Sequence, residues 1–185
     1  MNTAPELKKL FEPTRIGKMQ IKNRIVMPPM GTNMGTPGGH VTEEIVCYYR
    51  ERARGGVGLI IVETTCVDAP VGKTTAYQLA IDHDQFIPGL SRLAETIHQH
   101  GARAVLQLQH GGRGTKSAIT GIQPVAPSAI PMPYGTQVGY EGEMPRELAV
   151  NEIKELVRNF ARAAERAKRA GFDGVEIHST GYYLV

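Results

Sequence analysis

The side chains best suited to chemistry in this sequence follow four short apolar runs, at the points where those runs end. The fourth run is followed by an imidazole and a phenol, His178 and Tyr183, and the third run carries an amide, Gln107, near its end. Imidazole and phenol groups exchange protons, and all three groups form hydrogen bonds. A single polar residue after a strand caps a loop about as often as it serves a site. The prediction of one shared site therefore depends on all four ends, which together offer Pro29, Met30, Gly31, Thr32, Glu63, Thr64, Thr65, Gln107, His110, Arg113, His178, Thr180, Tyr182 and Tyr183.

The elements that must position these residues alternate between short apolar runs and longer amphipathic ones. The apolar runs, interpreted as strands, cover residues 25–27, 57–63, 103–108 and 173–178. Three helices are predicted between them: one from the N-cap Thr42 to about residue 54, one around residues 87–97 with Pro88 in its first turn, and one over residues 151–170. The last helix has one apolar stripe, made of Ile153, Leu156, Val157, Phe160, Ala164 and Ala167. This alternation predicts right-handed parallel βαβ units, whose active sites lie at the carboxyl ends of the strands.

Two α/β architectures fit that order, a doubly wound open sheet and a (β/α)₈ TIM barrel. An open sheet that binds a dinucleotide carries G-x-G-x-x-G after its first strand, but residues 28–39 read PPMGTNMGTPGG. The sequence therefore favours the barrel. A barrel takes about 250 residues. Because this chain offers about four strands and three helices, we interpret residues 1–185 as its N-terminal half.

Composition narrows the class of protein further. The net charge is +3 and basic residues are scattered, which gives no support for a nucleic-acid partner. Cys47 and Cys66 lie far apart and form no C-x-x-C pair, so we expect neither a disulfide framework nor a metal site. No run approaches the roughly 20 apolar residues of a membrane-spanning helix, and the first residues lack the apolar core of a signal peptide. We therefore expect a cytoplasmic protein with no membrane partner.

Five motifs then make the sequence recognisable: NRIVMPPM (23–30), GGVGLIIVE (55–63), QLQHGGR (107–113), APSAI (126–130) and GFDGVEIHSTGYYL (171–184). In this order they resemble the Old Yellow Enzyme family of FMN-dependent NADH:flavin oxidoreductases. The resemblance is closest to the branch that contains 2,4-dienoyl-CoA reductase and 2-enoate reductase. It implies an ene-reductase, a flavoprotein in which NADH or NADPH reduces FMN. Reduced FMN then passes hydride to the β-carbon of an electron-poor alkene, such as an enoate, an enone or an enoyl thioester. Residues 1–185 would then be the N-terminal half of an FMN-binding TIM-barrel domain.

The resemblance also assigns roles to individual residues. The catalytic pair would be Tyr183, which protonates the α-carbon, and His178, which hydrogen-bonds the activating carbonyl or carboxylate. A tyrosine with an ordinary pKa of about 10 holds its proton at neutral pH, and general acid assistance contributes about 10²–10⁴-fold in rate. The residues expected to contact FMN are Pro28, Pro29, Met30, Gly31, Thr64 and Gln107.

One position departs from the family pattern. The pattern His-x-x-His or His-x-x-Asn places a second hydrogen-bond donor where this sequence has Gly181. One arm of the carbonyl clamp is therefore missing, with Thr180 and Tyr182 as the nearest substitutes. A carboxylate or thioester substrate, held differently from an enone, stays open as an alternative.

Other interpretations remain beside this one. The non-enzymatic alternative is an inactive half-barrel, either a homo-oligomer paired through its open sheet edge or a gene remnant. A barrel that binds a different phosphorylated ligand is a further alternative. Residues 71–75, VGKTT, end like a Walker A loop but lack its first glycine, so we expect a surface loop there. The long relatives carry a 4Fe-4S cluster and an FAD domain, which we expect only in sequence beyond residue 185. Since late loops of a barrel bind the phosphate, we expect the 185-residue chain alone to bind FMN weakly or not at all.

Overall fold

The computed structural model describes residues 7–133, 142–179, 181 and 183–185, and its main feature is a four-stranded parallel sheet. The order of the strands in space, β3-β4-β5-β8, is also their order in the sequence. Parallel neighbours in sequential order are typical of a barrel wall, whereas a doubly wound sheet reverses direction at its centre. The strands are β3 (Val26–Met27), β4 (Leu59–Cys66), β5 (Arg103–Gln109) and β8 (Gly174–Ile177).

Three long helices connect these strands: α2 (Glu43–Arg54), α3 (Ile87–His98) and α5 (Val150–Arg169). All three pack in one hydrophobic core against alternate side chains of β4 and β5, among them Ile60, Val62, Ala104 and Leu106. Alternation along a strand sends the intervening side chains to the opposite face. There, Leu59 and Val105 pack against Ile21 at the amino end of the sheet. The carboxyl half of this second face carries polar residues instead.

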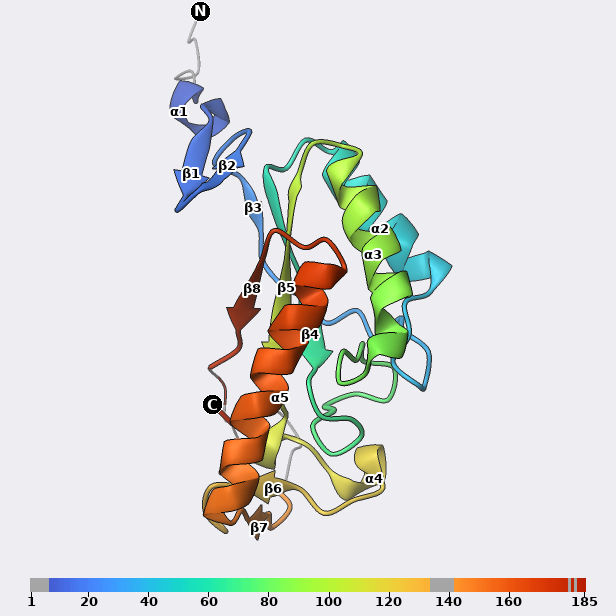
Figure 1. Cartoon of the computed structure of the whole chain (residues 1–185), viewed down its shortest axis with the longest axis vertical. Coiled ribbons are helices and arrows are strands. Elements are labelled where there is room, and N and C mark those ends of the chain that lie inside the picture. The colour runs from blue at the N-terminus through green and yellow to red at the C-terminus, as the bar shows by residue number, and fades with distance from the viewer. Residues whose placement is uncertain (1–6, 134–141, 180, 182) are drawn as a thin grey trace, which may run out of the picture.

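Short elements close the two ends of the sheet. A hairpin lies beside the amino ends of the strands, and the helices and strands of the long third loop lie beyond the carboxyl ends (Figure 1). The short elements are α1 (Lys8–Phe11), β1 (Thr14–Ile16), β2 (Met19–Ile21), η1 (Asp84–Phe86), η2 (Gly112–Gly114), α4 (Ser117–Thr120), β6 (Val125–Ala126) and β7 (Arg146–Glu147). Across the described ranges, no helix is both long and apolar enough to cross a membrane.

The helices begin where the sequence signals predict. Helix α2 starts directly after Thr42, whose side-chain oxygen accepts a hydrogen bond from the amide of Ile45 at 3.3 Å. Helix α3 has Pro88 in its first turn, where the missing N–H has no cost. Helix α5 begins at Val150, one residue earlier than expected. The N-cap Thr42 and the first-turn Pro88 therefore mark the starts of α2 and α3.

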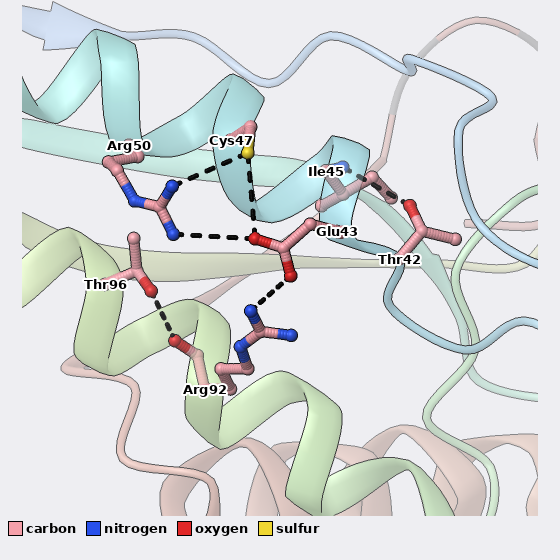
Figure 2. A network of polar contacts seen from close by, with 7 residues as sticks. All are labelled: Thr42, Glu43, Ile45, Cys47, Arg50, Arg92 and Thr96. Atoms are coloured by element: carbon pink, nitrogen blue, oxygen red, sulfur yellow. Dashed lines mark hydrogen bonds and ion pairs between the residues drawn. The ribbon is translucent and has the colours of Figure 1, made fainter.

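A polar network around Glu43 joins α2 to α3 (Figure 2). The Glu43 carboxylate lies 3.7 Å from the Arg50 guanidinium of its own helix and forms an ion pair with Arg92 of α3. The hydrogen bond from Arg92 is the main reason why the pKa of Glu43 lies below its ordinary value. Because these side chains are largely exposed, their ion pairs contribute little to stability.

The expected bounds of the second strand are wrong. Strand β4 begins at Leu59 rather than residue 57 and continues to Cys66, because Thr65 and Cys66 still pair with β5. On α5, Ile153 and Val157 do not face the core: they are 37% and 65% exposed. The first half of α5 extends past the sheet to β6 and β7 (Figure 1), and so its apolar stripe meets the helix-side core only farther along.

Candidate active site

The carboxyl ends of all four strands border one cavity of about 430 Å³. Six of the eight residues that were given catalytic or flavin-binding roles line it, namely Pro29, Gly31, Thr64, Gln107, His178 and Tyr183. A larger cavity, of about 690 Å³, lies at the opposite end of the sheet between the β1–β2 hairpin and the start of β5. We place the site in the smaller cavity, because ligands of parallel β/α folds bind at the carboxyl ends of the strands.

His178 and Tyr183 lie together at the end of β8. Their ring centroids are 4.7 Å apart and the two ring planes are tilted by 60°. The backbone amide of His178 donates to the carbonyl oxygen of Leu108 at 3.0 Å, which ties this segment to β5. The side-chain Nδ1 of His178 is buried and has no hydrogen-bond partner among the described residues. A buried ring nitrogen without a partner is costly, and a bound ligand is one way to satisfy it.

A bulge in β4 brings two consecutive residues to the cavity. The pairing of β4 with β5 shifts between Val62 and Thr65, so the intervening residues Glu63 and Thr64 do not follow the regular alternation. Bulges of this kind re-aim side chains next to active sites. As a result, both Glu63 and Thr64 line the cavity.

Gln107 points from β5 into the cavity beside a neighbouring carboxylate. Its Nε2 donates to Oε1 of Glu176 on β8 at 2.7 Å. This bond fixes the orientation of the amide and leaves its oxygen as an acceptor. A ligand with a hydrogen-bond donor on its edge could donate to that oxygen. The loop after β3 passes close by, since a Cβ built on Gly31 would lie 3.9 Å from Oγ1 of Thr64. The absence of a side chain at Gly31 leaves main chain to face a flat ligand.

Two predicted flavin contacts do not line this cavity. Pro28 is exposed, and Met30 is 52% exposed. Successive residues of the extended segment after β3 point in opposite directions, so Pro29 and Gly31 face the cavity while their neighbours do not. A role of Pro28 and Met30 in cofactor binding stays a prediction.

Sequence reasoning missed several residues of the loops. Asn33, Thr74, Thr75 and Gln78 also line the cavity. Gln78 holds the second loop in place, because its Nε2 donates to the carbonyl oxygen of Thr64 at 3.2 Å and its Oε1 accepts from the amide of Thr74 at 2.7 Å. The signal that could have found them is the length of the loops after β3 and β4, since long loops on this side of a barrel carry function.

The VGKTT segment belongs to this loop, and the expectation of a surface loop is only half right. Thr74 and Thr75 face the cavity, but the Lys73 side chain is buried and its Nζ donates to the carbonyl oxygen of Pro37 at 2.8 Å. Burial lowers the pKa of Lys73. The lysine is therefore occupied by the loop after β3 and joins the two loops that border the cavity.

Gly181 has a backbone conformation that favours glycine. Its φ of +77° lies in the left-handed region, and a Cβ built there would meet nothing within 4 Å. The second donor of the family pattern is thus absent from a position that has open space for a side chain.

Comparison with known proteins assigns this geometry to a family. The family model described as the NADH:flavin oxidoreductase / NADH oxidase family matches residues 9–185. The chain is 49% identical over 178 residues to an NADH oxidase of Thermoanaerobacter brockii, which covers 95% of this chain and 26% of that protein. The structure of the Old Yellow Enzyme homologue of Zymomonas mobilis is 36% identical, with a TM-score of 0.85, over 95% of this chain and 50% of that one.

A further solved structure extends the comparison. It is 2-naphthoyl-CoA reductase in complex with 2-naphthoyl-CoA, which is 28% identical with a TM-score of 0.89 over 96% of this chain and 28% of that chain. The chain thus spans between about a quarter and a half of the length of these three proteins. On this evidence its four-stranded sheet is a partial (β/α)₈ TIM barrel of the Old Yellow Enzyme type, and the chain belongs to the NADH:flavin oxidoreductase / NADH oxidase family.

Proposed function

We propose that the whole protein is an FMN-dependent NAD(P)H oxidoreductase that reduces the C=C bond of an electron-poor alkene, with Tyr183 as proton donor. The observation that carries this proposal is the arrangement of His178 and Tyr183, 4.7 Å apart, in the same cavity as Thr64 and Gln107. An acid and a hydrogen-bond donor beside a site for a flat polar ring are the groups that this reaction requires.

The residues of the cavity fit a flavin ring. The Gln107 amide would meet the pyrimidine part of the ring, which displays both donors and acceptors. Main chain at Pro29 and Gly31 would lie along one face, and Thr64 would approach the ring edge. When bound, FMN would supply the hydride, after reduction by NADH or NADPH. The phosphate would be held by loops that follow later strands of the barrel.

His178 and Tyr183 would contact two different atoms of the substrate. The His178 ring would donate a hydrogen bond to the carbonyl or carboxylate oxygen, where negative charge develops as the β-carbon receives hydride. The Tyr183 hydroxyl would transfer its proton to the α-carbon. The oxygen clamp has one arm at His178, because Gly181 offers no side chain. This favours a carboxylate or thioester substrate, held by groups other than the usual second donor, and the acyl-CoA bound to a structural neighbour is consistent with a thioester.

Substitution of Tyr183→Phe in the intact flavoprotein tests this proposal. Alkene-dependent reoxidation of the reduced flavin, followed by stopped-flow absorbance, should slow by about 10²–10⁴-fold. Reduction of the flavin by NADH should keep its rate, because that half-reaction does not use the proton donor. The control is Tyr77→Phe, since Tyr77 is 44% exposed and lies outside the cavity lining. An unchanged reoxidation rate in Tyr183→Phe would exclude Tyr183 as the acid.

A further inference from the structure

One buried carboxyl group borders the candidate active site without a part in the proposed chemistry. Glu63 lies at the bulge of β4, is 1% exposed and lines the cavity. Acidic side chains are almost never fully buried unless paired or hydrogen-bonded. The partners of Glu63 therefore indicate what it does.

The first partner is a tyrosine of α2. Tyr49 is fully buried, and its hydroxyl donates to Oε2 of Glu63 at 3.2 Å. The same hydroxyl accepts a hydrogen bond from the backbone amide of Glu63 at 2.9 Å. This paired contact fixes the carboxyl group relative to both the helix and the strand, so Glu63 has one rigid orientation.

The second partner is Thr32, in the loop after β3. The side chain and the backbone amide of Thr32 lie close enough to the Glu63 carboxyl group to lower its pKa. The Thr32 side-chain oxygen also accepts from the amide of Met34 at 3.3 Å. Because Thr32 turns toward Glu63, its two neighbours, Gly31 and Asn33, turn toward the cavity.

Asn33 connects the loop after β3 to the loop after β4. Its φ of +56° is in the left-handed region, which asparagine adopts more readily than most residues that carry a side chain. Its Oδ1 accepts a hydrogen bond from the amide of Tyr77 at 2.8 Å. The chain of contacts from α2 therefore extends through Glu63, Thr32 and Asn33 to the loop that carries Thr74 and Thr75.

We propose that Glu63 is a positioning residue, whose carboxyl group, held by Tyr49, fixes Thr32 so that Gly31 and Asn33 present their correct faces to the bound flavin. This inference rests on the proposed function. A carboxyl group suits the position because its two oxygens can accept from Tyr49 and from both donors of Thr32. An amide would turn an NH₂ group toward one of these donors. Burial raises the pKa of Glu63, and the neighbouring donors of Thr32 and Tyr49 oppose that change.

The test uses the full-length flavoprotein with three variants: Glu63→Gln, Glu63→Ala and Tyr49→Phe. The dissociation constant of FMN should rise by about tenfold or more in Glu63→Ala, as expected for lost hydrogen bonds to a charged group, and by less in Glu63→Gln. The absorption maxima of the bound flavin should shift in all three variants. The matched control is Tyr48→Phe, which removes a hydroxyl from the neighbouring residue of α2.

The possible outcomes separate this inference from the proposed function. Variants that unfold more easily but keep the wild-type flavin spectrum and FMN affinity would show that Glu63 is structural, and would overturn the inference alone. If Glu63→Ala does not fold, Glu63→Gln and Tyr49→Phe decide the question by the same two measurements. Failure of the wild-type protein to bind FMN would overturn both proposals. A spectral shift in the variants with wild-type behaviour of Tyr48→Phe would support the inference.

Discussion

Gly181 occupies the position where the family pattern places a second hydrogen-bond donor. The sequence pattern indicates a missing donor, and the structure adds a left-handed backbone with φ of +77° and open space around the Cβ position. Among residues with side chains, asparagine tolerates this conformation best. There is therefore room for a side chain at position 181, provided that the residue tolerates a left-handed backbone.

We predict that Gly181→Asn restores the second arm of the clamp. The variant should lower the KM for a simple cyclic enone in the intact flavoprotein, because a second donor would reach the carbonyl oxygen. The control is Gly181→Ala, which carries the left-handed strain of about 1 kcal/mol without a donor. Steady-state kinetics with both variants make the comparison, and equal KM values for Asn and Ala would contradict the prediction.

The residue scale also shows what the sequence could and could not predict about the site. The positions of Pro29, Thr64 and Gln107 were predictable because each lies near the carboxyl end of a recognisable strand, and parallel strands bring these ends to one edge. Asn33 and Gln78 were not predictable, because they reach the cavity through the path of long loops, which no periodic pattern encodes. Burial of Lys73 was hidden for the same reason: its partner, the carbonyl of Pro37, is distant in sequence.

At the scale of elements, local signals place the helices well and long-range pairing modifies the strands. Helix α2 covers Glu43–Arg54, because Thr42 marks its start and the glycines after Arg54 mark its end. Strand β4 differs because its final residues pair with β5 past a bulge, and pairing partners are not encoded locally. That bulge places Glu63 and Thr64 on the cavity side together, so an element-level irregularity determines part of the site.

Thr42 should contribute measurably to stability through two hydrogen bonds. Its side-chain oxygen accepts from the amide of Ile45, and its hydroxyl donates to the carbonyl oxygen of Met34 at 2.6 Å. Thr42→Ala should lower the free energy of unfolding by about 1–2 kcal/mol, the upper part of the range for a lost N-cap. Urea unfolding measures the change. Thr42→Ser, which keeps both bonds, should remain close to wild type, and an equal loss in Ser and Ala would argue against the capping role.

Helix α5 should show pH-dependent stability at its first turn. Arg146 donates to both oxygens of the Glu152 carboxylate, at 2.9 and 2.8 Å, and the amide of Ala149 donates to one of them at 2.8 Å. These bonds lower the pKa of Glu152 to about 2. Because the folded-state pKa lies below the unfolded value of about 4.3, this contribution is complete above that unfolded value. It is lost as pH falls toward the folded-state pKa.

Melting temperatures of wild type and Glu152→Gln test this dependence. The variant should melt lower at neutral pH, and the difference should shrink as pH falls below about 4. Glu165→Gln on the same helix is the control for the change in net charge, since Glu165 makes no ion pair with the described residues. A difference that stays constant with pH would mean that Glu152 acts through packing instead.

At the scale of the whole molecule, the sheet is open where a barrel is closed. The described residues supply four sequential parallel strands, and a closed barrel of this type has eight. Exposed apolar side chains accompany this opening: Val175 and Ile177 on β8 are 37% and 45% exposed, and Val157 on α5 is 65% exposed. These residues follow helix and strand periodicity but lack a partner layer among the described elements. Sequence patterns encode which face is apolar, and tertiary context alone determines what covers it.

The described strands are the first four of the barrel, and we therefore expect this chain to provide only part of the contacts to FMN. The flavin-ring contacts proposed here, such as Thr64 and Gln107, follow the first four strands of the barrel. The loops that bind phosphate in such barrels follow strands seven and eight. If the 185-residue chain is produced alone, it should therefore bind FMN weakly and no better than riboflavin, which lacks the phosphate. Fluorescence titrations with both ligands measure this. FMN affinity more than tenfold above that of riboflavin would place a phosphate site within these 185 residues, and would require a different assignment of the cavity.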